Sequence, residues 1–470
     1  MHSRRDQVQA QAYLNGRMVA AVLTADPDAP QSPTRRTTVG LLSGVAVMAL
    51  IIAGFAVYAW LSPGGAKRLN TPQALLVEKE TGARYVLVEG RLRPVLNDAS
   101  ARLLLGEGMK VTMVSRKSSG NLPHGSPLGV IGAPDPLPER SRLTGADWWA
   151  CADTAPGVDG RLKPSATLVV AAADPASFLT DQQAVLVRAP DGPRHLLWQG
   201  RRLKITQDWV VRALGFDSQP PVPVSAAWLG TVPQGPDLTG PDVPRRGQKS
   251  AVRVGGTAAT VGQIFVVDQP GLGRTRYVAL AEGLAALSDV DTALLLADPA
   301  TKVAYPGQSP YELSLTLSDR AAAASAVMPQ PAGRPVTSPA RLVWSEPQML
   351  CLAAATGPDG PQPRLLVRNP RATASAPASG PGIRADDRVA HRVAVPSGAG
   401  VVVRPLVASG TAGLATYVVT DTGVKYPVPT AQDLAALGYG QVVATPVPPA
   451  LLDLLPTGPE LSVDAAVRGK

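Results

Sequence analysis

The pattern of apolar and polar residues near the start of the chain predicts one membrane-spanning helix. The run from Val39 to Leu61 contains no charged residue and is long enough, as a helix, to cross a hydrocarbon core of about 30 Å. Arg35 and Arg36 come directly before it, which favours a cytoplasmic N-terminus, although Lys67 and Arg68 follow on the other side. A cleaved signal peptide is the alternative, but the run is long for a signal core and no clear A-x-A site follows it.

The residues before this run predict a second helix, which is amphipathic. Leu14, Met18, Ala21 and Val22 recur at helical spacing, so one face of a helix over Asp6 to Thr24 would be apolar. Such a face suits either a lipid surface or a partner protein. We therefore predict a cytoplasmic helix and linker over residues 1–38, and the membrane anchor over residues 39–61.

Beyond the anchor, one pattern of apolar strands and turns recurs four times. In each copy a strand and a turn lead to an aromatic or histidine position, and a glycine follows after five residues in the first two copies and six in the last two. These signature positions are Tyr85 and Gly90, His195 and Gly200, Tyr277 and Gly283, and Tyr417 and Gly423. Each glycine is expected at positive φ in a second turn, before a third strand and a helix. The expected helix starts are Asn97, Thr206, Ser288 and Thr430.

Each copy thus reads as a β-β-β-α module, and the uneven intervals between copies argue against a solenoid. The simplest arrangement inserts the second and third modules as a pair into a central domain that is built from both flanking segments. The predicted divisions are 70–121 (first module), 122–182 (central domain, first part), 183–255 (second module), 256–310 (third module), 311–398 (central domain, second part), 399–456 (fourth module) and 457–470 (C-terminal tail).

The predicted fold class is therefore α+β. A single N-terminal transmembrane helix would precede an elongated extracytoplasmic region of four β-β-β-α repeats around a central, mostly β domain. Segments rich in proline and glycine, such as Arg371 to Gly382, read as surface loops between these parts.

The chain has two cysteines, Cys151 and Cys351, one in each of the two segments between the modules. On the oxidising side of a membrane, this placement favours a disulfide that clasps the central domain. Two unrelated buried thiols are the alternative, since free cysteine is often a core residue.

Composition and charge narrow the class of partner. The 47 prolines and 45 glycines fit a loop-rich exported β protein. The formal charge of +9 does not indicate nucleic-acid binding, because the arginines are dispersed among prolines and form no stripe interleaved with stacking aromatics. Attraction to anionic lipid or to wall polymers stays open.

No constellation for catalysis emerges from the sequence. The string Arg246-Gly247-Gln248-Lys249-Ser250 lacks the first glycine of a phosphate-binding loop and carries a glutamine between glycine and lysine. The four histidines are too scattered for a metal site, and His124-Gly125-Ser126 reads as a turn. We therefore predict no catalytic, cofactor-binding or metal-binding residue.

Several stretches resemble a known family. The N-terminal helix and single anchor are followed by Arg84-Tyr85-Val86-Leu87-Val88-Glu89-Gly90-Arg91-Leu92-Arg93-Pro94-Val95-Leu96-Asn97, then by Leu128-Gly129-Val130-Ile131-Gly132-Ala133-Pro134-Asp135-Pro136-Leu137-Pro138, and then by Trp148 and Cys151. This order is similar to EccB, the bitopic membrane component of actinobacterial type VII (ESX) secretion systems. The resemblance covers essentially the whole chain, while the leucine-rich third module and the loop Arg371 to Gly382 diverge.

The resemblance implies a structural subunit of the inner-membrane secretion complex, without cofactors. Its implied partners are an FtsK-type ATPase (EccC), the membrane subunits EccD and EccE, a mycosin protease, and a second copy of the chain through the extracytoplasmic part. It also implies four repeats around a central domain, with a disulfide at the positions of Cys151 and Cys351.

Three function classes follow. The first is an anchored scaffold that braces the assembly on its periplasmic side. The second is an ATPase, an activity ascribed to EccB in some descriptions, for which this sequence offers no Walker motif. The third is a module that binds cell-wall polymer.

Overall fold

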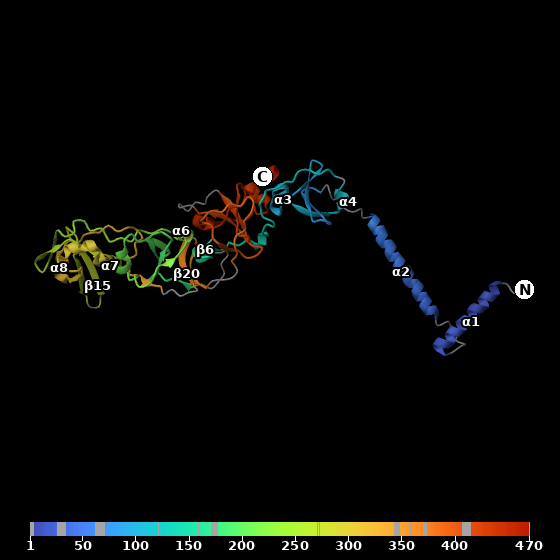
Figure 1. The fold of residues 1–470 in the computed structure, drawn as a ribbon, viewed down its shortest axis with the longest axis horizontal. Helices are drawn as coiled ribbons and strands as arrows, with labels where there is room; N and C mark the ends of the chain where they lie inside the picture. The colour runs from blue at the N-terminus through green and yellow to red at the C-terminus, as the bar shows by residue number, and fades with distance from the viewer. Residues whose placement is uncertain are drawn as a thin grey trace. The chain divides into compact units, whose positions relative to one another are not determined.

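A computed structural model describes most of the chain (Figure 1). The described residues are 4–25, 34–61, 71–120, 122–145, 147–157, 159–170, 177–269, 271, 273–342, 348–357, 360–369, 374–406 and 415–469. The predicted linker before the anchor falls largely on residues 26–33, which lie outside this set. The predicted boundary between anchor and first module (62–70) and part of the loop Arg371 to Gly382 lie outside it too.

Two helices form the N-terminal part, α1 (Arg4–Thr24) and α2 (Thr34–Leu61). Within α2, the segment Thr37–Tyr58 is 22 residues long and contains an 18-residue window with a mean hydropathy of 2.4, so it is long and apolar enough to cross a membrane. Large apolar side chains such as Leu50 and Phe55 are exposed along it, as expected of a helix whose solvent is lipid.

Contacts divide the chain into two compact units. One comprises residues Met1–Ala83, Leu87–Leu92 and Val111–Pro123, and the other comprises Arg84–Val86, Arg93–Lys110 and His124–Lys470.

Four sheets share one strand order, in which the third, second, first and fourth strands along the chain lie side by side. They are β3 (Arg91–Pro94), β2 (Arg84–Val88), β1 (Ala74–Glu78) and β4 (Lys110–Val114); β10 (Arg201–Lys204), β9 (Arg194–Trp198), β8 (Gln183–Arg188) and β11 (Val222–Pro223); β16 (Leu284–Leu287), β15 (Gly273–Ala279), β14 (Ile264–Gln269) and β17 (Glu312–Ser314); and β24 (Lys425–Val428), β23 (Thr416–Thr420), β22 (Gly400–Pro405) and β25 (Thr445–Val447). In the last three sheets the fourth strand runs parallel to the first. The sequence prediction of three strands missed this fourth one.

A helix connects the third strand to the fourth in each sheet. These helices are α3 (Asp98–Leu105), α5 (Asp208–Ala213), α7 (Asp289–Ala297), which is followed by the 3₁₀ helix η3 (Pro299–Ala304), and α9 (Ala431–Ala436). Asn97, Ser288 and Thr430 cap their helices with side-chain oxygens, as expected. The second helix begins one residue later than expected, with Gln207 rather than Thr206 at its N-cap and no side-chain cap.

A short helix and a returning segment follow the fourth strand of every sheet, so each unit is longer than the predicted β-β-β-α. The short helices are α4 (Arg116–Ser119), α6 (Ala226–Thr231), α8 (Leu317–Ala322) and α10 (Pro449–Leu452). The returning segments, which we name straps, are residues 122–128, 232–238, 323–328 and 455–461. In each case an N–H of the third strand, from Leu92, Arg202, Leu284 or Lys425, donates to a strap carbonyl, of Pro123, Pro233, Ala324 or Pro456.

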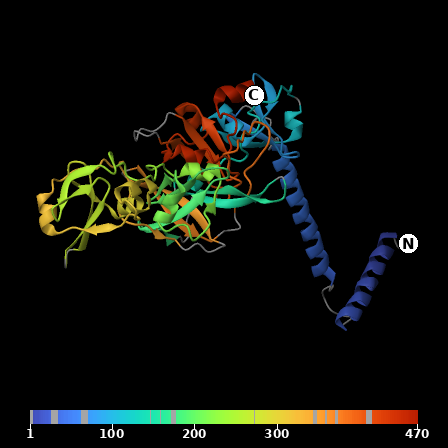
Figure 2. The ribbon, with the colours of Figure 1, turned by 60° about the vertical axis from the view of Figure 1, so that its left-hand side comes forward.

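A six-stranded sheet lies between the modules in the chain and takes strands from both intervening segments. Its order is β21 (Arg392–Ala394), β6 (Leu162–Val170), β5 (Trp148–Pro156), β19 (Met349–Gly357), β20 (Gly360–Arg368) and β7 (Ser177–Phe178). Figures 1 and 2 both show the blue-green strands of residues 148–170 beside the orange strands of residues 349–368. We name it the central sheet.

The remaining described elements are a separate two-stranded hairpin, one further strand and two short helices. The hairpin β12 (Lys249–Val254) and β13 (Thr257–Thr260) packs on the third sheet, through Val252 against Phe265 and Val267, although the sequence analysis assigned residues 249–254 to the second module. The strand β18 (Ala340–Arg341) pairs with β8, and η2 (Arg140–Arg142) and α11 (Val463–Arg468) are the last short helices.

Candidate functional site: a clasped sheet and its attached modules

A disulfide lies in the middle of the central sheet. Cys151 on β5 and Cys351 on β19 face each other across neighbouring antiparallel strands, with their sulfur atoms 2.01 Å apart. Both are almost completely buried, beside Trp149 and Leu366. The bond closes a loop of 200 residues, and a loop of this length restricts the unfolded chain by about 5 kcal/mol in the chain-entropy description.

The other face of the central sheet forms one apolar core with the second and fourth sheets. Trp148 and Leu168 of the central sheet share this core with Val187 of the second sheet and Val403 of the fourth. Trp228 of α6 adds a direct tie, because its indole N–H donates to the Ala150 carbonyl at 2.8 Å. Both sheets are therefore held against the clasped sheet by buried side chains rather than by a surface contact.

Helices join the modules in pairs. Val210 and Val211 of α5 pack with Val290 and Leu294 of α7, which links the second and third sheets. Helix α3, which follows β3, packs with α9 and α11 in the same way, with Leu103, Leu437 and Ala466 in one cluster. The inner modules thus share one helix interface and the outer modules another.

Three of the four straps carry a glycine at the same position, because the strap passes very close to the third strand there. A Cβ on Gly125 or Gly235 would come within 2.9 Å of a third-strand side chain, and a Cβ on Gly458 would lie 2.3 Å from the ring of Tyr426. Glycine is the residue that lets two backbones approach this closely. The sequence signal was present but missed: Leu122-Pro123-His124-Gly125, Val232-Pro233-Gln234-Gly235 and Leu455-Pro456-Thr457-Gly458 share the pattern [LV]-P-x-G.

The signature glycines divide into two groups. Gly90, Gly200 and Gly423 have φ of +76°, +70° and +73°, as expected for the second turn. Gly283 is not in the positive-φ region, so the expectation was wrong for it. There the requirement is steric instead, because a Cβ would lie 2.3 Å from the Ala324 carbonyl oxygen of the strap.

Two of the four signature positions, Tyr85 and Tyr277, contact the returning part of their own module. The Tyr85 ring meets His124 of the first strap edge-on, with centroids 5.7 Å apart. The guanidinium of Arg320 on α8 lies 4.8 Å from the centroid of Tyr277. His195 is half-buried, and burial is the main cause that lowers its pKa. Tyr417 packs against the core that the central sheet shares with the fourth sheet.

The expected docking face lies on α1. Leu14, Met18 and Val22 are 62%, 65% and 84% exposed, and Ala21 is partly exposed on the same side. Other apolar side chains of α1, namely Val8, Tyr13, Val19 and Leu23, are exposed as well and lie off that face. The apolar surface of the helix is therefore wider than the stripe that the sequence analysis singled out.

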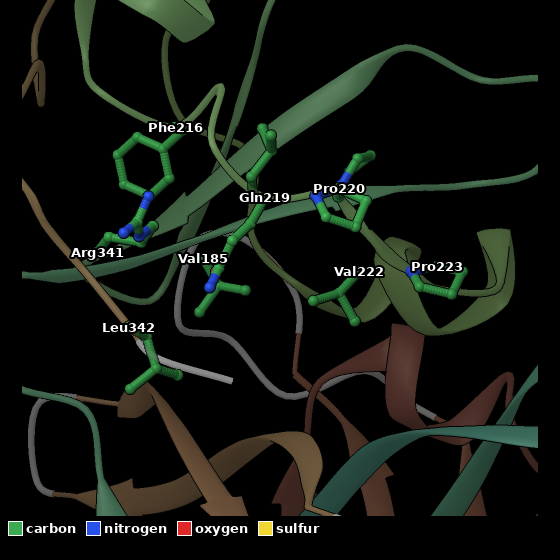
Figure 3. A pocket seen from close by; sticks show the side chains of 10 residues that line it. Val185, Phe216, Gln219, Pro220, Val222, Pro223, Arg341 and Leu342 are labelled. Atoms are coloured by element: carbon green, nitrogen blue, oxygen red, sulfur yellow. The ribbon is translucent and has the colours of Figure 1, made fainter. Parts of the chain in front are cut away.

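A cavity of about 300 Å³ lies at the edge of the second sheet (Figure 3). The strands β11 and β18 both pair with β8, at Val187 and at Ala184, and the cavity opens between them. Its walls are mostly apolar, with Phe216 among them, while Gln219 is polar and Arg341 is its charged residue. Neither a histidine nor a carboxylate lines it, and the described part of the chain holds no cluster of three metal-ligating side chains. The cavity thus supplies no acid–base pair.

Comparison with known proteins identifies the family. The sequence model described as "Type VII secretion system ESX-1, transport TM domain B" matches residues 1–470. The chain belongs to this family, EccB. It is 30% identical to the "ESX-3 secretion system ATPase EccB3" of Mycolicibacterium smegmatis, over 97% of this chain and 89% of that protein. It is 27% identical to the "ESX-1 secretion system ATPase EccB1" of Mycobacterium tuberculosis, over 98% and 93% of the two chains.

Solved structures agree with this EccB assignment. An EccB3 dimer from the ESX-3 core complex has a TM-score of 0.67 and 26% identity, and the match covers 84% of this chain and 99% of that one. A chain of an intact ESX-5 inner membrane complex has a TM-score of 0.68 at 24% identity, which shows a shared fold over 99% and 95% of the two chains. EccB is a component of ESX inner membrane complexes, and this chain is accordingly a type VII secretion component.

Proposed function

We propose that the chain is a non-enzymatic bitopic scaffold of an ESX secretion complex. Its N-terminus would be cytoplasmic, α2 would cross the membrane, and the remainder would brace the assembly on the periplasmic side as four repeats around a central domain. The observation that carries the proposal is the continuous packing of module sheets onto one disulfide-clasped sheet. Arg35 and Arg36 before the anchor support the orientation.

The proposed partners are other ESX membrane subunits and a second copy of the chain. A solved relative is described as an EccB3 dimer from a core complex, which supports self-association. We propose that the two copies meet through the extracytoplasmic part. EccC, EccD, EccE and the mycosin protease are the candidates for the remaining contacts. The exposed apolar surface of α1 is the proposed cytoplasmic contact.

Substitutions on α1 test the scaffold role directly. Replacing Leu14, Met18 and Val22 by serine is expected to reduce the assembled complex on native gels of solubilised membranes, as is deletion of residues 6–24. The matched control replaces Val8, Val19 and Leu23, which are also apolar and exposed but lie off the proposed face. Normal assembly and secretion after the deletion would contradict the proposal, and equal loss in both triple variants would contradict the assigned face.

We also propose that the clasp is closed in the envelope. Membrane-isolated protein whose free thiols are alkylated before electrophoresis should migrate differently with and without reductant, and Cys151→Ser should abolish the difference. Mass spectrometry that finds both thiols alkylated without prior reduction would refute the bridge.

The ATPase named in the descriptions of the relatives is the second candidate. The sequence contains no G-x-x-x-x-G-K-[ST] loop, so we expect the purified chain to show no saturable ATP hydrolysis. Hydrolysis that persists through purification and is lost in a single point variant would favour this candidate over the scaffold. Binding to wall polymer, the third class, would appear as co-sedimentation with isolated peptidoglycan at moderate salt.

A further inference from the structure

Three side chains stand in a row at the edge of the fourth sheet. Arg384 and Thr457 exchange two backbone hydrogen bonds of 2.8 Å, and Thr457 pairs in turn with Lys425 of β24. Residues that face each other on neighbouring strands direct their side chains to the same side of a sheet. The Arg384 guanidinium, the Thr457 hydroxyl and the Lys425 ammonium therefore lie side by side, with the hydroxyl between two cations.

This row lines a cavity of about 320 Å³. The other charged groups at the cavity are Asp386, Asp453 and Arg388. The Arg388 guanidinium donates to Asp386 at 2.8 Å and to Asp453 at 3.1 Å, so it occupies both carboxylates. Among the described residues, the Arg384 guanidinium and the Thr457 hydroxyl have no side-chain hydrogen-bond partner.

Lys425 forms the floor of the cavity, since only 8% of its surface is exposed. Its ammonium donates to the carbonyl of Leu452 at the end of α10. Burial is the main cause that lowers the pKa of Lys425; Asp453 and Asp386 oppose the shift and Arg388 adds to it. The carboxylates already present thus do not offset the desolvation of this cation, and a further anion would do so.

The second module shows which part of this arrangement is structural. Arg202 occupies the position of Lys425 on its own third strand and donates to the Leu229 carbonyl of α6 at 3.0 Å. A cation that closes the end of the short helix is therefore common to both modules. The strap residue opposite Arg202 is Gln234, a neutral amide, and the second module pairs no arginine with it. The second module thus has the structural cation but lacks the second, converging one.

We propose that the cavity between Arg384 and Lys425 binds a phosphate-class oxyanion, with the Thr457 hydroxyl donating between the two cations. Arginine and lysine give charge-assisted hydrogen bonds to phosphate oxygens, and the cavity has room for one phosphate with a few further atoms. Two sources supply such a group: free phosphate, and the phosphoglycerol group of a lipid or polymer. This site goes beyond the scaffold role and does not depend on it.

Calorimetric titration of the full chain in detergent, with inorganic phosphate at constant ionic strength, tests the site. We expect saturable binding that weakens about tenfold or more in Arg384→Gln and in Lys425→Met, and that is unchanged in Arg202→Met. Arg384 is exposed, so its variant stays informative if Lys425→Met fails to fold. A parallel titration with sn-glycerol 3-phosphate distinguishes the sources: tighter binding indicates a phosphoglycerol group, and equal binding indicates free phosphate.

Three results would overturn the assignment. The first is that the unmodified chain shows no saturable binding at tens of millimolar phosphate. The second is that Arg384→Gln binds phosphate as tightly as the unmodified chain, and the third is that acetate binds as tightly as phosphate. The last would mean that the cavity selects carboxylates or charge alone.

Discussion

The third and fourth sheets have the same strand order but stabilise the same helix position by different means. In both helices an aspartate lies three residues after the N-cap residue. Its carboxylate accepts a hydrogen bond from the N-cap hydroxyl. The carboxylate of Asp291 is completely buried and pairs with Arg334 at 3.1 Å, whereas Asp433 accepts the backbone N–H of Val463 at 2.8 Å. A buried ion pair makes the geometry specific, but both charges must be desolvated, which costs free energy. A hydrogen bond from a backbone N–H is weaker, but it requires the desolvation of one charge only.

The straps of these two sheets differ in a matching way. In the fourth sheet Gly458 lies against the large ring of Tyr426, and in the third sheet the corresponding position is Ala326, which packs on the cluster of Ala285. The strap residue is therefore smaller where the third-strand residue is larger, so the two sizes compensate. What the fold requires is the distance between the two backbones, and different residue pairs satisfy it.

Removal of the Arg334 charge in the third module should have the largest effect on stability. Arg334→Met leaves the Asp291 carboxylate buried without its cation, which costs about 3–5 kcal/mol. Hydrogen exchange of peptides from α7 should speed up accordingly. The double variant Arg334→Met with Asp291→Asn should regain most of the protection. Unchanged exchange in the single variant would show that the pair contributes nothing there.

A methyl group in the fourth strap should have the next largest effect. Gly458→Ala places a Cβ against the Tyr426 ring and should cost about 1–3 kcal/mol through overpacking. The control Ala326→Gly in the third strap should cost only about 0.5–1 kcal/mol. Tyr426→Ala is itself destabilising because this ring is buried, but in that background the further change Gly458→Ala should cost little. An equal cost of Gly458→Ala with and without the Tyr426 ring would refute the size-matching explanation.

Loss of the aspartate in the fourth module should have a moderate effect. Asp433→Ala removes the acceptors of Thr430 and Val463, and we expect a cost of about 1–2 kcal/mol. Faster hydrogen exchange in α11 would report it, because Val463 begins that helix. Asp433→Asn keeps an acceptor oxygen and serves as the control. An effect as large as that of Arg334→Met would remove the distinction between the two sheets.

The second module should show a small pH dependence that the third and fourth lack. Burial lowers the pKa of His195, so the folded chain favours the neutral ring. A pKa below the unfolded value of about 6.5 stabilises the module above that pH, and this contribution is lost as the pH falls through the folded pKa. His195→Tyr, which matches the tyrosines of the other modules, should flatten exchange protection of β9 between neutral and mildly acidic pH. An unchanged pH profile in this variant would contradict the prediction.

The sequence predicted the features that depend on local turn chemistry or on composition. The glycine spacing predicted the hairpins because Glu89-Gly90 and Gln199-Gly200 both take positive φ, as a two-residue hairpin turn requires. The uncharged run before the modules likewise predicted the apolar helix.

The features that depend on distant backbone pairing were missed. The strand β11 has two residues, too few to show alternation, and the straps pair only through single bridges. The Asp291–Arg334 pair depends on the path of the chain through the third strap and beyond it to Arg334, so spacing gives no hint of the pair. The proposed anion site was hidden for the same reason, because Arg384, Lys425 and Thr457 lie on three separate segments.

In the proposed orientation the N-terminal part of the extracytoplasmic region is exported first, and the strand order of the central sheet then sets the order in which its parts can fold. Strands β5 and β6 emerge first, but their neighbour β19 follows only after both inner modules have passed, and β21 follows later still. Contacts between such distant segments form slowly, whereas each inner module consists of neighbouring segments. The inner pair can therefore fold while the sheet is still open, and the bond between Cys151 and Cys351 cannot form until Cys351 has been exported. A partner or oxidant that acts on the early strands has that interval in which to do so.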